Sequence, residues 1–416
     1  MRRASHLTRR LTASLALTAV AGLGASAIAP AATAAPADPA GFGLHVIADP
    51  AKNPVPATPY GSVRIWDIGV TWGKVQMKPG KNGKDKWWWT GLDQAINNAR
   101  AQGVKPLYVL GSTPTWIAGS CKKGSYPNKG AACVPSMSAW KKWVTAVAKR
   151  YKGKGVAYQI WNEANLSTFW SGSPQQLADL TKAAKQVIRK YDSTATVVSA
   201  SSTVRLTASY NKFFPAYLKA LKKAGWPVDV FSVHLYPEGT GTPANRADYI
   251  ETVKGDLQQA GAPARPLWDT EVNYGFSGPG GIPGVNIDGD TAAAYVSQTY
   301  LDDLRLGVAR AYWYSYTLTP YSRGGVQLMA GTAGTTGYAT TYGWVAGGDV
   351  NCTTGAVNTC TVVKNGTTAT IAWASTGSGP FTVPAGATKS VTASNVSTPV
   401  SAGQVVTIGS MPTWFG

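Results

Sequence analysis

The sequence predicts an α/β fold in which a (β/α)8 TIM barrel is followed by a small C-terminal β domain. Between residue 40 and about residue 345, eight short apolar runs alternate with amphipathic segments of helical spacing. Beyond that point Thr, Ser, Val, Gly and Ala dominate, and only three formal charges remain before Gly416. We therefore expect a signal peptide at 1–35, the barrel at 36–345 and the β domain at 346–416.

The first 35 residues have the composition of a secretory signal peptide. Four arginines precede an apolar stretch from Leu11 to Ile28, and Ala32-Thr33-Ala34 provides the small residues of a cleavage site. A membrane anchor is the alternative, but glycines and a proline interrupt the apolar run. No later stretch approaches the ~18 uninterrupted apolar residues that a membrane helix needs. We expect a secreted, extracellular protein without a membrane span.

The eight apolar runs are the predicted strands of the barrel. They consist mostly of uninterrupted apolar, β-branched or aromatic residues, as in parallel strands that are covered on both faces. Helices between them carry boundary signals, such as Ser173-Pro174 at a start and Gly307 at an end. An open doubly wound sheet is the alternative, but no Gly-x-Gly-x-x-Gly motif follows the first run. The predicted strands are Phe42–Val46, Ser62–Gly69, Pro106–Gly111, Val156–Trp161, Thr196–Ala200, Val228–His234, Arg265–Thr270 and Ala309–Tyr316.

The C-terminal segment, residues 346–416, contains short alternating runs separated by Asn-Gly and Gly-Ser turn signals. This pattern predicts a small β domain that packs on the barrel. Carbohydrate binding is the alternative role, with Trp373 as the prominent aromatic residue, but capping of the barrel is favoured.

The four cysteines form two sequence-local groups, which predict the disulfides Cys121–Cys133 and Cys352–Cys360 in an exported chain. A zinc site is the alternative, but neither group has Cys-x-x-Cys spacing. Only two histidines remain once the signal peptide is removed. We therefore expect neither a metal nor an organic cofactor.

The formal charge is +19, and it falls to +15 when the first 35 residues, with four arginines and no acid, are removed. Such a charge attracts polyanions. Because much of it lies on helical faces, a solvated surface or electrostatic association with an anionic cell wall is favoured over a specific anionic substrate. No motif of nucleic-acid recognition accompanies the charge, so we expect no nucleic-acid partner.

Two carboxylates follow predicted strands on opposite sides of the barrel. Glu163 ends the fourth strand in "IWNEAN", and Glu271 ends the seventh in "WDTEVNYG". The C-terminal ends of barrel strands meet at one face, where catalytic groups lie. A carboxylate pair suits cleavage of a glycosidic bond, with retention at ~5 Å and inversion at ~6.5–9.5 Å. A strand-end turn with local hydrogen bonds is the alternative for Asn162 and Glu163.

These two motifs resemble the acid/base and nucleophile signatures of clan A retaining glycoside hydrolases, and the layout of residues 40–345 is most similar to family 39. The resemblance implies that Glu163 is the acid/base, with a raised pKa, and that Glu271 is the nucleophile. One departure is Ala164, where the family commonly has Pro. The substrate-binding residues implied are Arg64, which holds the nucleophile ionised, Asn162, which binds the sugar 2-hydroxyl, His234 and Tyr236, which form an aromatic pair, and Trp313, which floors a subsite.

Several of these residues have a structural alternative. Arg64 could form an ordinary core ion pair, and His234 could be a satisfied core histidine. Tryptophans of barrels more often pack in the core than bind sugar. Because Trp116 lies in the loop after the third strand, we predict that it binds sugar, as Trp313 is expected to do.

The resulting hypothesis is a secreted retaining glycoside hydrolase that acts on an extracellular or cell-wall polysaccharide or its oligosaccharides. A transglycosylase that uses the same two glutamates is one alternative, and a noncatalytic protein that binds cell-wall carbohydrate is another. The loop Gly119–Pro135, with Lys122, Lys123 and Lys129, is expected to shape one side of the cleft and gives local support to an acidic substrate.

Overall fold

The computed structural model describes residues 36–278, 281–320 and 323–416. The predicted signal peptide lies outside the described residues. Within the described ranges, no helix combines the length and the apolar character needed to cross a membrane.

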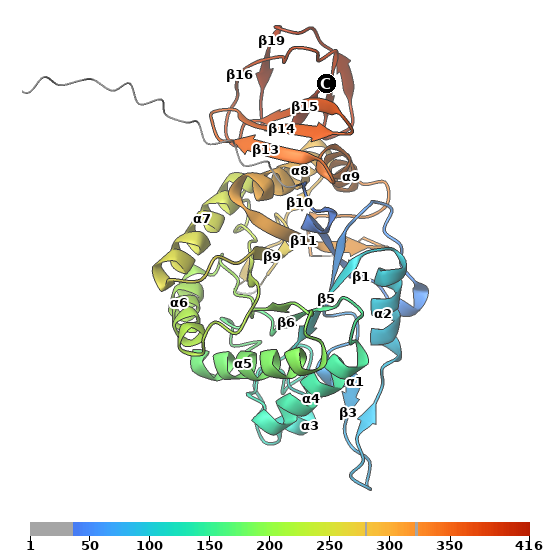
Figure 1. Ribbon diagram of the computed structural model, residues 1–416, viewed down its shortest axis with the longest axis vertical. Helices are drawn as coiled ribbons and strands as arrows, with labels where there is room; N and C mark the ends of the chain where they lie inside the picture. Colours follow the sequence, from blue (N-terminus) through green and yellow to red (C-terminus); the bar gives the residue numbers. More distant parts are fainter. Residues whose placement is uncertain (1–35, 279–280, 321–322) are drawn as a thin grey trace, which may run out of the picture. The chain divides into compact units, whose positions relative to one another are not determined.

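Eight parallel strands form the predicted barrel, with the helices around them (Figure 1). The ladder runs in the order β7-β6-β5-β2-β1-β11-β9-β8. Backbone hydrogen bonds from Ser199 to Val230 and from His234 to Ser202, each 2.9 Å, join its two ends. All eight predicted strands are confirmed: β1 (Phe42–Ile47), β2 (Ser62–Ile65), β5 (Lys105–Leu110), β6 (Ala157–Ile160), β7 (Val197–Val198), β8 (Phe231–His234), β9 (Leu267–Val272) and β11 (Val308–Thr317).

The long helices connect successive strands and bury one face against them. Ser173 caps α5 with a capping box, and Gly307, at φ 77°, follows the last residue of α8, as the boundary signals predicted. These helices are α2 (Thr90–Ala101), α4 (Met137–Arg150), α5 (Pro174–Tyr191), α6 (Thr207–Lys223), α7 (Pro243–Ala260), α8 (Gly289–Leu306) and α9 (Ala333–Val345). Short elements lie in the loops: the helices α1 (Trp72–Val75) and α3 (Thr115–Ala118) and the strand pairs β3 (Gln76–Met77) with β4 (Lys86–Trp87) and β10 (Asn286–Ile287) with β12 (Gly325–Val326).

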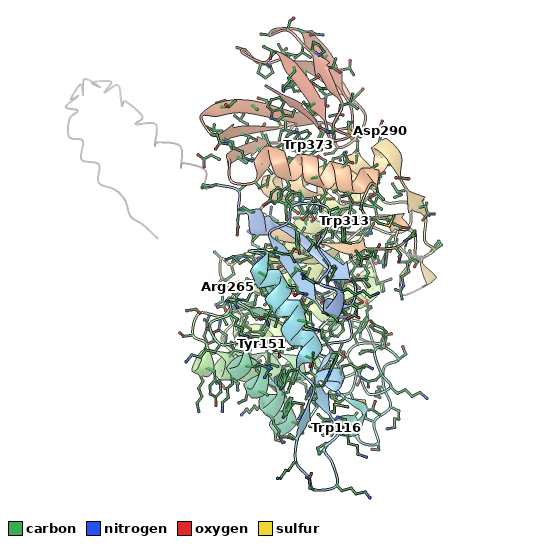
Figure 2. All side chains as sticks on the ribbon, turned by 90° about the vertical axis from the view of Figure 1, so that its right-hand side faces the viewer. Trp116, Tyr151, Arg265, Asp290, Trp313 and Trp373 are labelled. Carbon is green, nitrogen blue, oxygen red and sulfur yellow. A yellow bond between two sulfur atoms is a disulfide. The ribbon has the colours of Figure 1, made fainter. Side chains whose placement is uncertain are left out.

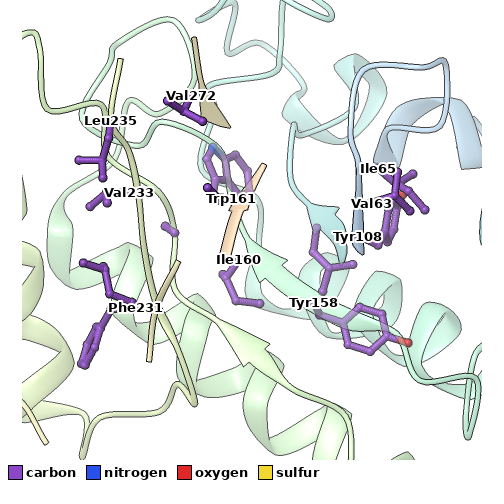
Figure 3. Close-up of a cluster of buried hydrophobic side chains, with 14 of the residues drawn as sticks. Val63, Ile65, Tyr108, Tyr158, Ile160, Trp161, Phe231, Val233, Leu235 and Val272 are labelled. Atoms are coloured by element: carbon purple, nitrogen blue, oxygen red, sulfur yellow. The ribbon is translucent and has the colours of Figure 1, made fainter. Parts of the chain in front are cut away.

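The core has an apolar layer and a polar layer in the barrel interior. Six buried residues form the apolar layer: Leu107, Ala157, Val198, Val230, Trp268 and Tyr312. Two residues farther along three of these strands, Gln159, Ser232 and Thr270 form a hydrogen-bonded layer. On the outer face of the strands, a larger apolar cluster packs against the helices. Figure 3 shows part of it, with Phe231, Val233 and Ile160.

The C-terminal residues form antiparallel sheets. One has the order β13 (Asp349–Thr353), β14 (Asn358–Lys364), β15 (Thr367–Trp373), β20 (Thr413–Phe415), β17 (Lys389–Thr392) and β18 (Ser397–Pro399); β16 (Gly379–Thr382) pairs with β19 (Val405–Ile408). Trp373 is fully buried in the same apolar cluster as Tyr300 of α8 and Val345 of α9. It therefore packs in the core and offers no exposed platform for a sugar (Figure 2).

Both predicted disulfides are present. Cys121 and Cys133 close a loop between β5 and α4. Cys352 and Cys360 join directly paired positions of β13 and β14. One bridge thus constrains a loop of the barrel and the other the first hairpin of the C-terminal sheet.

A buried charge network ties three elements together behind the barrel wall. Arg246 of α7 donates to Asp269 of β9 at 2.8 and 3.0 Å and to Asp303 of α8 at 2.6 Å. The second carboxylate oxygen of Asp269 accepts from the backbone N–H of Leu235 at 3.1 Å. Burial raises the pKa of Asp269 to about 7 and that of Asp303 to about 6, although Arg246 opposes the shift.

We expect Arg246→Met to lower the free energy of unfolding by about 3–5 kcal/mol, because it leaves two buried carboxyl groups without their cation. Without Arg246 these carboxyl groups take up protons at a higher pH than in the wild type, so the deficit should shrink as the pH falls through about 7 and 6. Urea unfolding at pH 8 and pH 5 measures both effects. Lys254→Met on the same helix, which breaks only an exposed pair with Glu251, should cost less than about 1 kcal/mol. Equal losses in the two variants would show that the network does not stabilise the fold.

Candidate active site

A cavity of about 600 Å³ lies at the C-terminal ends of the barrel strands. It brings Asn162, Glu163, Tyr236 and Glu271 together, as the sequence predicted, while Arg64 and His234 lie fully buried behind them. Its lining comes from the ends of several strands and from the loops that follow: Trp66, Asp67, Tyr126, Asn162, Glu163, Thr168, Phe169, Arg205, Tyr236, Glu271, Phe276, Ser277, Gly278, Tyr314 and Arg323.

A register shift in the pairing of β8 and β9 directs Glu271 into this cavity. Val233 pairs with Asp269, but the next residue, His234, pairs with Glu271, so β9 has one extra residue at Thr270. A bulge of this kind re-aims side chains. Thr270 bonds Gln159 inside the barrel, and its neighbour Glu271 also faces inward, which strict alternation would forbid.

Arg64 of β2 is a buried cation that organises the site. Its Nη1 donates to Glu271 Oε1 at 2.5 Å, its Nη2 to Asn162 Oδ1 at 2.6 Å and its Nε to Gln159 Oε1 at 2.9 Å. Because the amide oxygen of Asn162 is occupied in this way, its NH2 group is the donor available to a ligand. Arg64 therefore fixes the nucleophile candidate and a sugar-binding candidate at once.

Glu271 receives a second donor from Tyr236. The Tyr236 hydroxyl donates to Glu271 Oε2 at 2.8 Å. Burial and the neighbouring Glu271 raise the pKa of Tyr236 well above its ordinary value, so the hydroxyl keeps its proton. Each oxygen of Glu271 thus accepts a hydrogen bond, and the two donors fix the orientation of the carboxyl group.

Glu163 stands on a strained turn at the end of β6. Trp161 and Glu163 both have left-handed backbone conformations, with φ of 75° and 37°. The turn is held by the Ser201 hydroxyl, which accepts from the Glu163 backbone N–H at 3.0 Å, and by the Ser201 carbonyl, which accepts from Ala164. Ala164 fits this turn without the proline that is common in the resembling family.

The carboxyl group of Glu163 has no ion pair with Lys or Arg among the described residues. Burial raises its pKa from the ordinary value to about 7, although Arg205 and Arg64 act in the opposite direction. Glu163 is therefore protonated below neutral pH. Glu271, by contrast, forms an ion pair with Arg64.

His234 lies between the two carboxyl groups as a neutral ring. Its Nδ1 is 3.1 Å from Glu163 Oε1 and 3.4 Å from Glu271 Oε2. Burial lowers the pKa of His234 to about 3, with Arg64 acting in the same direction. A neutral ring protonated at Nδ1 donates to these carboxyl groups without adding a charge that would hold Glu163 ionised.

The geometry favours a retaining glycosidase over a metal centre. One carboxylate oxygen from each of Glu163 and Glu271 and one ring nitrogen of His234 all lie within 4.8 Å of one another. This short separation fits the ~5–5.5 Å of retaining enzymes rather than the ~6.5–9.5 Å that leaves room for an attacking water. The same three residues could ligate a metal ion. However, Glu271 is already paired with the Arg64 guanidinium, whose positive charge repels a metal cation at this position.

Asp67, a carboxylate that also lines the cavity, was not predicted from the sequence. Asp67, just past β2, contacts His45 Nε2 at 2.5 Å and accepts from the Tyr314 hydroxyl at 2.8 Å. Burial would raise the pKa of Asp67, but His45 and Tyr314 outweigh it and lower the pKa to about 2. The signal was its position two residues after a strand end, in "VRIWD".

The two predicted tryptophans, both labelled in Figure 2, are absent from the cavity lining. Trp313 is fully buried, and its indole N–H donates to Val326 O at 3.2 Å. Tyr312 and Tyr314 face the barrel interior, so alternation turns Trp313 outward, and Tyr314 is the β11 residue at the cavity. Trp116, in α3, instead donates to the carbonyl of Gln76 at 3.3 Å and is absent from the cavity lining.

The disulfide-closed loop reaches the cavity through Tyr126, as the predicted shaping role requires. Ala132 of this loop accepts at its carbonyl from the backbone N–H and hydroxyl of Ser171, in the loop that follows Glu163. The bridge Cys121–Cys133 therefore braces one wall of the cavity.

Comparison with known proteins agrees with this geometry. Residues 69–321 match the family model described as glycosyl hydrolases family 39. A β-xylosidase of Geobacillus stearothermophilus is 22% identical over 248 residues, which are 54% of this chain and 46% of that protein. The chain thus spans about half the length of this curated relative.

Solved structures show the same fold. A family 39 β-xylosidase from Caulobacter crescentus has a TM-score of 0.66 at 17% identity, with 92% of this chain and 97% of that chain covered. The family 39 enzyme from Xanthomonas axonopodis pv. citri has a TM-score of 0.63 at 17% identity, with 92% and 95% covered. A family 30 xylanase C catalytic domain from Talaromyces cellulolyticus has 0.60 at 15% identity, with 92% and 97% covered.

We expect one glutamate to titrate near pH 7, because the pKa of Glu163 is raised to about 7 by burial. Carbon-13 NMR of selectively labelled protein measures this directly, since the sequence has only four glutamates: Glu163, Glu238, Glu251 and Glu271. Glu163→Gln should remove the high-pH titration and so assign it. If no glutamate carboxyl titrates above about pH 6, Glu163 is ionised at neutral pH and cannot be the acid.

Proposed function

The chain belongs to glycosyl hydrolase family 39, and from this premise we propose that it is a retaining glycoside hydrolase that cleaves O-glycosidic bonds by double displacement. The observation that supports this most is that two carboxyl groups, with oxygen atoms within 4.8 Å of each other, have contrasting surroundings. Glu271 accepts from Arg64 and Tyr236, whereas Glu163 has its pKa raised to about 7. One group is suited to attack and the other to proton donation.

In the first step, a carboxylate oxygen of Glu271 forms a bond to the anomeric carbon of the sugar. The bond from that carbon to the leaving oxygen breaks, and Glu163 transfers its proton to this oxygen. Asn162, whose amide oxygen is held by Arg64, presents its NH2 group to the sugar hydroxyl beside the reacting carbon. The products are a glycosyl ester on Glu271 and an ionised Glu163.

In the second step, Glu163 removes a proton from a water molecule, and the water oxygen bonds to the anomeric carbon. The ester bond breaks, and Glu271 returns as a carboxylate to the donors Arg64 and Tyr236. Two inversions at one carbon retain its configuration. A sugar hydroxyl in place of water would give transglycosylation at the same site.

The proposed substrate is an extracellular or cell-wall polysaccharide or one of its oligosaccharides. Export is supported by the composition of residues 1–35 and by the two disulfides. Because the similar proteins include β-xylosidases and a xylanase, β-xylosides are the first substrates to examine. The chain's positive charge supports loose association with an anionic wall.

We expect Glu271→Gln to reduce kcat by about 10³-fold or more on every substrate, because it removes the nucleophile. Glu163→Gln should cost about 10²–10⁴-fold on xylo-oligosaccharides, whose leaving groups need a proton. On 4-nitrophenyl β-xyloside it should slow the first step far less, because nitrophenolate leaves without one. Kinetics on both substrate types, with product configuration followed by proton NMR, test these roles. Undiminished hydrolysis by either variant would remove that residue from the mechanism.

The pH dependence follows from the raised pKa of Glu163. Because the acid must be protonated, kcat/KM should fall as the pH rises through about 7. The pH profile of hydrolysis of a neutral oligosaccharide measures this limb. A profile that stays flat to pH 9 would contradict the assignment of Glu163 as the acid.

A further inference from the structure

Arg205, in the loop between β7 and α6, is a buried cation that the proposed mechanism does not use. Its side chain is 3% exposed and lines the catalytic cavity. Its guanidinium stacks over the Tyr236 ring at 4.7 Å, and Nη1 donates to the carbonyl of Phe276 at 3.1 Å. Its Nε is buried and has no hydrogen-bond partner.

No carboxylate among the described residues forms an ion pair with Arg205. The other two buried arginines are paired, Arg64 with Glu271 and Arg246 with Asp269 and Asp303. A buried cation without an anion carries a large desolvation cost. A buried group that lacks its partner in the free protein is therefore a candidate for ligand binding.

The wall around Arg205 is shaped to admit its guanidinium. A Cβ at Gly278 would lie 1.8 Å from Nη2, so a larger residue there would displace the guanidinium from its present position. Arg323 lines the same cavity, and its carbonyl accepts from the backbone N–H of Ser277. Both arginines thus border the segment Ser277–Gly278 of the cavity lining, whereas Asp67, which follows β2, is the acidic residue of the same lining.

Arg205 stands after the strand that neighbours the one preceding Glu163, the proposed acid. It follows β7, which pairs with β6, the strand that carries Glu163. The positive charge of Arg205 is the first cause that lowers the pKa of Glu163 against the effect of burial. The other charged or titratable groups around Glu163 are Arg64 from β2, His234 and Tyr236 from β8 and its following loop, and Glu271 from β9. Since Glu163 protonates the leaving oxygen, the position after β7 favours the leaving-group side, while the contacts of Arg205 with Tyr236 and Phe276 also border Glu271.

We propose that Arg205 binds a carboxylate or sulfate group on the sugar at the leaving-group side, so that the preferred substrate is an acidic polysaccharide. This inference rests on the proposed function only for the choice of side. The ligand anion would complete the pairing of the guanidinium with charge-assisted hydrogen bonds. The lysines at 122, 123 and 129 are exposed on the loop that carries Tyr126 to the cavity, and their charge attracts the same polymers.

Calorimetric titration of the purified protein with glucuronate, glucose 6-sulfate and glucose tests this site. Charge-assisted hydrogen bonds contribute ~1.5–3 kcal/mol, so the charged sugars should bind about 10- to 100-fold more tightly than glucose. Arg205→Met should abolish this preference, and Arg205→Lys should keep part of it. Arg100→Met, at an exposed position of α2 outside the cavity lining, is the matched control and should change nothing. Thermal unfolding confirms that each variant is folded.

The outcomes separate the proposal from its alternatives. Equal binding of glucose, glucuronate and glucose 6-sulfate, or a preference that survives Arg205→Met, would overturn it. If Arg205→Met leaves the binding preference intact but shifts the pH profile for a neutral xyloside, Arg205 acts only on Glu163, and the anion site is wrong. Preference for glucuronate alone identifies a uronic acid, and preference for glucose 6-sulfate alone identifies a sulfated sugar.

The choice of side has its own measurement. A glycosyl group trapped on Glu271 fills the glycone side, and the charged sugar should still bind to this trapped enzyme. Loss of binding would place the anion on the glycone side and contradict our assignment. If no glycosyl group can be trapped, the hydrolase function fails, while the titration of the free protein still decides whether Arg205 binds anions.

Discussion

The buried contact between Arg64 and Glu271 is the interaction on which the rest of the site depends. A guanidinium inside a barrel is tolerated only when its donors are satisfied, and Arg64 meets this condition through Gln159, Asn162 and Glu271. Gln159 in turn donates to Ser232 and Thr270, so the polar layer of four strands is built around one cation. Arg64 thus organises both the polar interior and the orientation of Glu271, the proposed nucleophile. The bulge at Thr270 in β9 places Glu271 within hydrogen-bond distance of Arg64.

The two glutamates differ because Glu271 is paired with Arg64, whereas Glu163 is buried without an ion pair to Lys or Arg among the described residues. Glu271 has two donors, whereas Glu163 stands on a strained turn and faces a neutral His234. A protonated His234 would stabilise the carboxylate form of Glu163, so burial, which keeps the ring neutral, supports the proposed role of Glu163 as the acid. Tyr236 links both halves of the cavity, because its hydroxyl binds Glu271 while its ring face carries Arg205. The cavity therefore has a proposed nucleophile that is paired with Arg64 and a proposed acid whose pKa is lowered by Arg205 against the effect of burial.

The sequence predicted the barrel well because strands covered on both faces are apolar throughout, and the C-terminal ends of such strands converge. Glu163, Glu271, Asn162 and Tyr236 were found from this rule and from family resemblance, and they meet in one cavity. Trp313 was misplaced because the side on which a strand residue faces depends on register, and β11 turns Tyr314 inward instead. Asp67 escaped prediction although it stands two residues past a strand end, and Arg205 because it stands seven residues past β7, within a loop. Their roles follow only from contacts between residues distant in sequence.

The most direct test of this assignment is the identity of the residue that becomes glycosylated. A 2-fluoro-2-deoxy-β-xylosyl fluoride slows both steps but has a good leaving group, so the ester should accumulate. Intact-mass analysis followed by peptide mapping should find one added fluoroxylosyl group, on the peptide that contains Glu271, and Glu271→Gln should remain unlabelled. Hydrolysis of β-xylosides together with labelling at another residue, or with an ester that forms equally in Glu271→Gln, would show that the carboxylate held by Arg64 is not the nucleophile.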